Sequence, residues 1–163
     1  MSLESGAIGA ALEREHHEID EGIEGFNSEQ LSAEERTESL QRAIDALRRH
    51  IYLEEEFLYP PMEPDLAIPT MVMLREHGEI WRSLDAIEAK LGEDGSDQSL
   101  PQACRMLLVL LAIHNGKEEP IFYSAADATL SGSESAELSE LIDSGSMPNG
   151  WVCRMANESP PTT

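Results

Sequence analysis

The sequence has few of the features that mark disulfide-bonded, secreted or membrane-spanning proteins. Its 2 cysteines, Cys104 in an apolar run and Cys153 in a polar tail, cannot form a disulfide framework, so both are expected to be free thiols. The densest apolar run, Met106 to Ile113, is too short to span a bilayer. Because the N-terminus lacks a basic segment followed by an apolar one, no secretory leader is expected and the protein is predicted to be cytoplasmic.

Basic residues are also scarce. The 163 residues include 11 Lys and Arg against 32 Asp and Glu, which gives a formal net charge of -21. This charge repels nucleic-acid phosphates and anionic membrane surfaces, so neither is expected as a partner. The acidity does not by itself indicate cation binding, because a soluble acidic surface is the commoner cause of a low isoelectric point.

Aromatic residues make up only 5% of the chain, and runs of β-branched residues are few. Leu, Ala, Ile and Glu are prominent instead, and this composition favours helices over sheets. The length is that of one ordinary domain. The sequence therefore predicts a single all-α domain.

Apolar residues at three- and four-residue steps predict four amphipathic helices. We expect them over residues 7–26, 32–58, 69–91 and 99–127. Ser32 and Glu35 have the spacing of a capping box at the start of the second helix, and Pro60 with Pro61 should stop it. Gly92 should end the third helix. Short or moderate loops between such helices predict an up-down-up-down four-helix bundle over residues 1–127.

Residues 128–163 are expected to lie outside the bundle. A short helix is predicted over residues 133–142, followed by a flexible acidic and polar tail rich in Ser, Gly, Pro and Asn. Trp151 and Cys153 are the candidate residues of this tail for docking on the bundle or on a partner.

The two halves of the predicted bundle contain an internal repeat. Glu15-His16-His17-Glu18-Ile19 resembles Glu76-His77-Gly78-Glu79-Ile80. Further along, His50-Ile-Tyr-Leu-Glu54-Glu55 resembles His114-Asn-Gly-Lys-Glu118-Glu119, and a tyrosine follows each block, at Tyr59 and Tyr123. Each half therefore reads as a helical hairpin with one early histidine and a late His-x-x-x-Glu pair.

The spacing of these residues has a direct geometric meaning. Residues four apart on a helix differ by about 40° around its axis, so a late His-x-x-x-Glu pair can bind one ion. On the first helix, His16 lies about 45° from the centre of the apolar stripe and the adjacent His17 about 145° from it. His77 lies about 50° from its own stripe. We therefore expect His16 and His77, but not His17, to face the core.

Four of the five histidines thus fall on inward positions. A lone inward histidine is more often a hydrogen-bonded core residue than a ligand, and a lone His-x-x-x-Glu pair is more often a surface contact. Two matched pairs with two further inward histidines are hard to obtain from packing alone. An unpaired carboxylate beside the core would be costly, and a cation would compensate it. We predict a metal site that is formed by His16, His50, Glu54, His77, His114 and Glu118. This ligand set suits iron, manganese or zinc.

With these motifs, residues 7–126 resemble the hemerythrin-like, or HHE cation-binding, domains. The repeated Glu-His-x-x-Ile and His-x-x-x-Glu-Glu elements carry the resemblance. It implies a hemerythrin-like bundle with two iron ions joined by an oxo or hydroxo bridge and by the carboxylates of Glu54 and Glu118. By motif position, one iron would be served by His16 and His50, and the other by His77 and His114.

Two departures separate this chain from the oxygen-carrying members of that family. Those carriers have a His-x-x-x-His pair on the third helix, whereas Met73 and Trp81 lie four residues to either side of His77 here. Their fourth helix uses His-x-x-x-x-Asp, whereas here His114 is followed by Glu118. Four His with two Glu resembles bacterial members linked to oxidative and nitrosative stress, iron repair or peroxide consumption. This resemblance disfavours reversible oxygen carriage.

Counting ligands supports the same expectation. Two His, two bridging carboxylate oxygens and one oxo bridge make five bonds per iron and leave one open position on each. The hypothesis is a redox reaction with a small molecule, namely peroxide, NO or O2, with an electron donor that the sequence does not identify. The alternative is an iron or oxygen sensor or binding module without turnover. Both a monomer and a homodimer are compatible with the sequence.

Three further residues remain open as ligands, namely Tyr52, His17 and Glu119. Tyr59 and Tyr123 are considered together with Tyr52, because a phenolate could fill a vacant ferric position. Tyr52 lies about 160° from Glu54 on an ideal helix, so we expect it at a helix interface. Pro120 follows Glu119 directly and is expected to bend the fourth helix beside the site.

Overall fold

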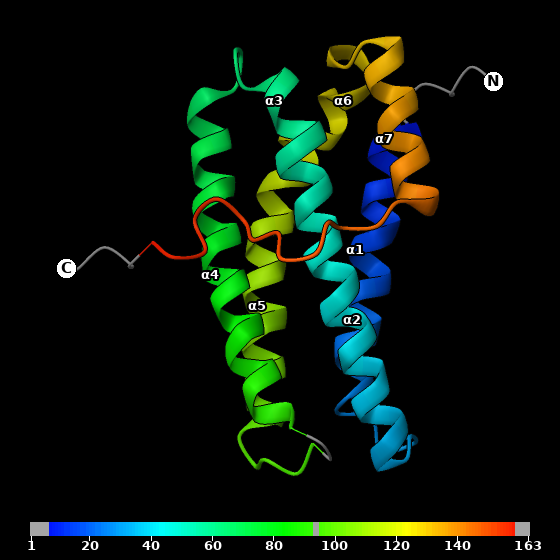
Figure 1. The fold of residues 1–163 in the computed structure, drawn as a ribbon, viewed down its shortest axis with the longest axis vertical. Helices are drawn as coiled ribbons and strands as arrows, with labels where there is room; N and C mark the ends of the chain where they lie inside the picture. The colour runs from blue at the N-terminus through cyan, green and yellow to red at the C-terminus, as the bar shows by residue number, and fades with distance from the viewer. Residues whose placement is uncertain (1–6, 93–94, 159–163) are drawn as a thin grey trace.

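In a computed structural model, which describes residues 7–92 and 95–158, those residues form helices and no strand. Four long helices run alternately up and down the bundle axis (Figure 1). They are α1 (Ala7–Gly25), α2 (Ala33–Leu53), α4 (Ala67–Leu91) and α5 (Leu100–Glu118). α1 packs against α2 and α5, and α4 packs against α5 and α2, so the four helices enclose one core. The predicted all-α, up-down-up-down bundle is confirmed.

Local sequence signals set several helix ends. The Ser32 side chain accepts a hydrogen bond from the backbone N–H of Glu35, and the Glu35 side chain accepts one from the N–H of Ser32. This capping box begins α2. Gly92 ends α4 with a φ of 54°, a backbone conformation that suits glycine. No helix in the described part of the chain is long and apolar enough to cross a membrane.

The second and fourth helical segments continue through a single π-helical turn. η1 (Glu54–Leu58) leads from α2 into α3 (Tyr59–Met62), and η2 (Glu119–Tyr123) leads from α5 into α6 (Ser124–Thr129). The predicted stop at Pro60 and Pro61 is wrong, because both lie in the first turn after η1, where no α-helical N–H is required. Pro120 lies inside η2.

The C-terminal residues follow the bundle closely. α7 (Gly132–Ser144) begins with a second capping box, formed by Ser131 and Glu134, and packs against α1 and α2. Residues 145–158, which we call the C-terminal strap, then cross the outside of α2 and α4 near mid-height (Figure 1). Cys153 and Ala156 of this strap are buried. The expected flexible tail is thus a docked segment as far as residue 158, because a few apolar side chains anchor its polar sequence. Residues 159–163 lie outside the described part.

The core consists of two apolar clusters with a polar layer between them. On α1, Leu12 belongs to one cluster and Ile19 to the other, and the buried His16 lies between them in the sequence. The same order occurs on α4, where His77 separates residues of the two clusters. Polar residues therefore interrupt the core at one level of the bundle.

The two capping boxes allow a matched test of how strongly α2 and α7 contribute to stability. Ser32→Ala should lower the free energy of unfolding by about 1 kcal/mol, because it removes a cap from a helix of the bundle. Ser131→Ala should mainly speed amide exchange within α7, because that helix is peripheral. Urea unfolding and hydrogen exchange measure the two effects. An equal global loss for both variants would show that α7 is as integral to the core as α2.

Candidate metal centre

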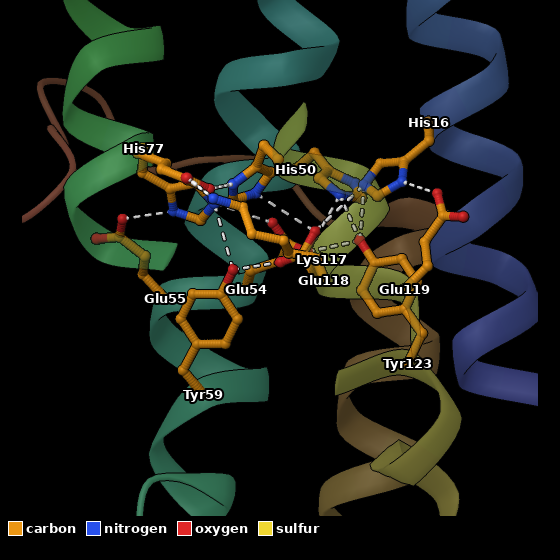
Figure 2. A network of polar contacts seen from close by, with 12 residues as sticks. His16, His50, Glu54, Glu55, Tyr59, His77, Lys117, Glu118, Glu119 and Tyr123 are labelled. Carbon is orange, nitrogen blue, oxygen red and sulfur yellow. Dashed lines mark hydrogen bonds and ion pairs between the residues drawn. The ribbon is translucent and has the colours of Figure 1, made fainter. Parts of the chain in front are cut away.

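Six buried side chains meet in the polar layer, one imidazole from each long helix and two carboxylates between them (Figure 2). They are His16, His50, Glu54, His77, His114 and Glu118, and each is at most 5% exposed. Glu54 is the first residue of η1, and Glu118 is the last residue of α5. The structure therefore brings together all six side chains that were predicted from the sequence.

The six residues form two overlapping groups of four. One consists of His16, His50, Glu54 and Glu118, and the other of Glu54, His77, His114 and Glu118, with the potential ligand atoms in each group within 4.8 Å of one another. Glu54 Oε2 lies 3.3 Å from His50 Nε2, and Glu54 Oε1 lies 3.3 Å from His77 Nε2. Glu54 thus presents one oxygen to each group.

Glu118 also faces both groups. Its Oε1 lies 3.4 Å from His16 Nε2 and 3.5 Å from His114 Nε2. Its other oxygen accepts a hydrogen bond from the Tyr59 hydroxyl. The two carboxylates are therefore the residues that both groups share.

Each central histidine is oriented by an outer glutamate that accepts a hydrogen bond from Nδ1. The pairs are His16 with Glu119 (2.9 Å), His50 with Glu15 (2.8 Å), His77 with Glu55 (2.8 Å) and His114 with Glu76 (3.0 Å). Because Nδ1 is engaged in this way, Nε2 is the nitrogen of each ring that faces the centre. Such outer carboxylates fix ring orientation and increase the basicity of a ligating imidazole.

The sequence repeat contains these outer glutamates, but no role was predicted for Glu15, Glu55 and Glu76, and Glu119 was considered only as a possible metal ligand. Their presence at matching places in both halves was the available signal. The contacts are reciprocal, since Glu55 of the first half binds His77 of the second and Glu119 of the second half binds His16 of the first. The repeat thus encodes the supporting contacts as well as the central cluster.

Tyr59 and Tyr123 also enter the centre, and the π-helical turns place them there. In an α-helix, a residue five positions after a glutamate would lie about 140° away from it. In η1 the N–H of Tyr59 bonds to the carbonyl oxygen of Glu54, and this wider turn brings the two residues toward one face. η2 begins one residue after Glu118 and ends at Tyr123, so a π-helical turn also separates this glutamate from its tyrosine.

The two phenol oxygens lie beside the histidine nitrogens. The Tyr123 hydroxyl donates to Glu54 Oε2 at 2.6 Å and lies 2.8 Å from His16 Nε2 and 2.9 Å from His50 Nε2. Tyr59 Oη lies 3.3 Å from His77 Nε2. Burial, reinforced by the charges of Glu118 and Glu54, holds the pKa of both phenols well above its usual range. A phenol oxygen therefore adjoins each of the two groups.

The three residues left open by the sequence occupy other places. His17 is exposed on α1. Tyr52 packs edge-on against Phe57 and Trp151, in contact with the strap. Glu119 contacts the outer nitrogen of His16.

The charges at the centre fit a cation site. Burial raises the pKa of Glu118, but the charge and hydrogen bond of His114 outweigh it and hold that pKa well below its usual range. Burial lowers the pKa of His114, but the nearby carboxylates outweigh it and raise the pKa to about 10. Even so, Glu54 Oε1, Glu118 Oε1 and His114 Nε2 are buried without a hydrogen-bond partner among the described residues. Inward-facing imidazole and carboxylate atoms of this kind are suitable ligands for transition metals.

Comparison with known proteins identifies the family. The sequence matches the hemerythrin HHE cation binding domain over residues 7–126, which include all four long helices. Comparisons with curated proteins and with solved structures found no match. The family match covers most of the chain, and the helices it includes form the bundle around the two histidine and glutamate groups, so the chain belongs to the hemerythrin HHE cation-binding domain family.

Proposed function

We propose that the protein binds two iron ions between the six central side chains and uses them to react with peroxide, nitric oxide or oxygen. The sharing of Glu54 and Glu118 by two groups of ligand atoms carries this proposal. Glutamates from different helices are the recurring means by which helical bundles hold a pair of metal ions. Manganese and zinc accept the same donor set, so metal analysis is part of the test. A role in oxidative or nitrosative stress or in iron handling follows from this chemistry.

Iron bound between these residues would supply Lewis acidity and one-electron redox chemistry. The protein supplies four Nε2 donors whose rings are oriented by outer glutamates. The six central side chains are at most 5% exposed, so they keep bulk water out of the centre and strengthen the electrostatic interactions within it. We assign His16 and His50 to one metal and His77 with His114 to the other, in agreement with the two groups.

Tyr59 and Tyr123 are proposed to hold protons at the edge of the centre. Each hydroxyl donates a hydrogen bond to a shared carboxylate, and each phenol oxygen adjoins a histidine nitrogen. A small molecule that enters beside either phenol would therefore meet a positioned proton donor. Both tyrosines follow a shared glutamate by five residues, so the two halves of the centre offer the same group.

Iron content and stability test the metal site. Anaerobic addition of Fe²⁺ should load about two iron ions per chain and raise the free energy of unfolding by about 2.7 kcal/mol for each bound ion when free metal exceeds Kd 100-fold. Glu118→Gln should lose most of this gain, because it removes a shared carboxylate. Glu21→Gln, at an exposed position of α1, is the matched control and should retain it. Elemental analysis and urea unfolding supply the readouts, and a chain that binds no metal would contradict the proposal.

Reactivity is tested by stopped-flow absorption with peroxide, nitric oxide and oxygen. We expect a spectral change with at least one of them, because the iron pair would be redox active. Steady-state consumption of peroxide would show that the protein is an enzyme. Metal-dependent protease resistance without turnover would assign the alternative, an iron or oxygen sensor or binding module. The absence of any spectral change in both redox states would refute the proposed reaction.

Tyr→Phe variants distinguish whether the phenols at the centre act as proton donors or as metal ligands. Tyr123→Phe and Tyr59→Phe should slow the reaction by about 10²-fold or more if the phenols donate protons. Tyr52→Phe should leave the rate unchanged, because this ring packs outside the centre. A visible absorption band of the ferric protein that disappears in either of the first two variants would show instead that the phenol is deprotonated and bound to metal.

A further inference from the structure

The two halves of the centre are related by the sequence repeat, but their surroundings differ. Glu55 and Glu119 are equivalent residues, and each accepts a hydrogen bond from Nδ1 of a central histidine. The side chain of Glu55 is 3% exposed, whereas that of Glu119 is 31% exposed. The C-terminal strap covers the Glu55 side, because its backbone bonds directly to that carboxylate.

Backbone contacts fix the strap beside this glutamate. The N–H of Arg154 donates to Glu55 Oε1 at 2.9 Å. The guanidinium of Arg82, on α4, donates to the carbonyl oxygens of Met155 at 3.0 Å and Ala156 at 3.3 Å. These bonds tie the strap to α4 as well as to η1.

Side-chain packing anchors the strap a few residues earlier. The Trp151 ring packs edge-on against Tyr52 of α2 and Trp81 of α4, and its Nε1 donates to Glu56 at 3.0 Å. Cys153 is only 2% exposed. The strap therefore packs against both α2 and α4, the helices that also supply His50 and His77.

The two copies of the repeat differ at one position in a way that matches the contact between the strap and α4. Gly78 follows His77, at the place that His17 occupies after His16. A Cβ on Gly78 would lie 2.5 Å from the carbonyl oxygen of Met155, a distance too short for van der Waals contact. His17 is exposed on α1. A side chain is therefore compatible with the uncovered half of the centre and not with the covered half.

Glu55 connects the strap to the centre, since one oxygen binds the Arg154 amide and the other binds His77. We propose that the strap acts through Glu55 to position His77, so that the His77 and His114 position releases metal more slowly than the His16 and His50 position. This inference rests on the proposed binding of two metal ions. The side chain of Glu119 is 31% exposed, so it fixes His16 less firmly. Outer-ligand contacts of this kind change metal affinity by about 10- to 100-fold.

Metal release from a Gly78→Ala variant tests the inference. The protein is loaded anaerobically with Fe²⁺ and mixed with an excess of a coloured ferrous chelator. The unaltered protein should release iron in two equal phases, separated about 10-fold or more in rate. Gly78→Ala should accelerate the slow phase toward the fast one, because the new methyl displaces the strap while every ligand side chain remains. The fast phase is an internal reference, since a general loosening of the bundle would accelerate both.

Gly116→Ala is the matched control. Gly116 lies on α5 two residues after His114, and a Cβ built on it would meet nothing within 4 Å apart from its own stretch of helix. This variant gains the same helix propensity without touching the strap, so both phases should remain unchanged. Trp151→Ala is a second way to release the strap and should accelerate the slow phase as Gly78→Ala does.

Thiol labelling of the metal-free protein reports on the strap independently of iron. Cys153 is a buried residue of the strap itself, and Cys104 is buried in the core of the bundle. Gly78→Ala and Trp151→Ala should speed the labelling of Cys153 and leave that of Cys104 unchanged. Two irons that leave at a single rate, or a slow phase that persists after Cys153 becomes reactive, would overturn the role of the strap and leave the proposed function standing. Failure to bind iron would overturn both.

Discussion

Two carboxylates buried within the core impose the main constraint on this bundle. Glu54 and Glu118 are 1% and 0% exposed, and charges removed from water in this way require compensation. Four imidazoles and two phenols provide it at close range, and the outer glutamates hold the imidazoles in place. The buried carboxylates therefore depend on the rings, the rings depend on the outer glutamates, and on one side the outer glutamate Glu55 depends on the strap.

The architecture and the central cluster could be predicted because both depend on helical periodicity. The angle of about 100° per residue selected His16 over His17, and the structure has His16 buried and His17 exposed. The ends of α1 and α4 lie close to their predicted positions, since caps and glycines act locally. The internal repeat also predicted that the two hairpins face each other, which the pattern of a single helix could not indicate. That the six residues bind metal remains a prediction of the same reasoning.

The remaining features depend on contacts that periodicity does not describe. Ordinary helical arithmetic placed Tyr52 correctly outside the centre, but it does not describe Tyr59, because a π-helical turn brings that residue toward the face of Glu54. The prolines after η1 were read as a stop, although they lie where a helix tolerates them. The strap was expected to be flexible because its composition is polar. One tryptophan and a few backbone hydrogen bonds hold the strap on the bundle, and the average composition of the segment does not reveal these individual contacts.

The polar layer also divides the apolar core into two stacked halves. Cohesion between these halves comes from the helical backbones that run through both and from the histidine, glutamate and tyrosine contacts at their boundary. If those contacts are weakened, either half can open while the other stays closed, and the bundle then has two cooperative units in place of one. The chemistry at the centre and the mechanical integrity of the whole domain are in this way properties of the same set of side chains.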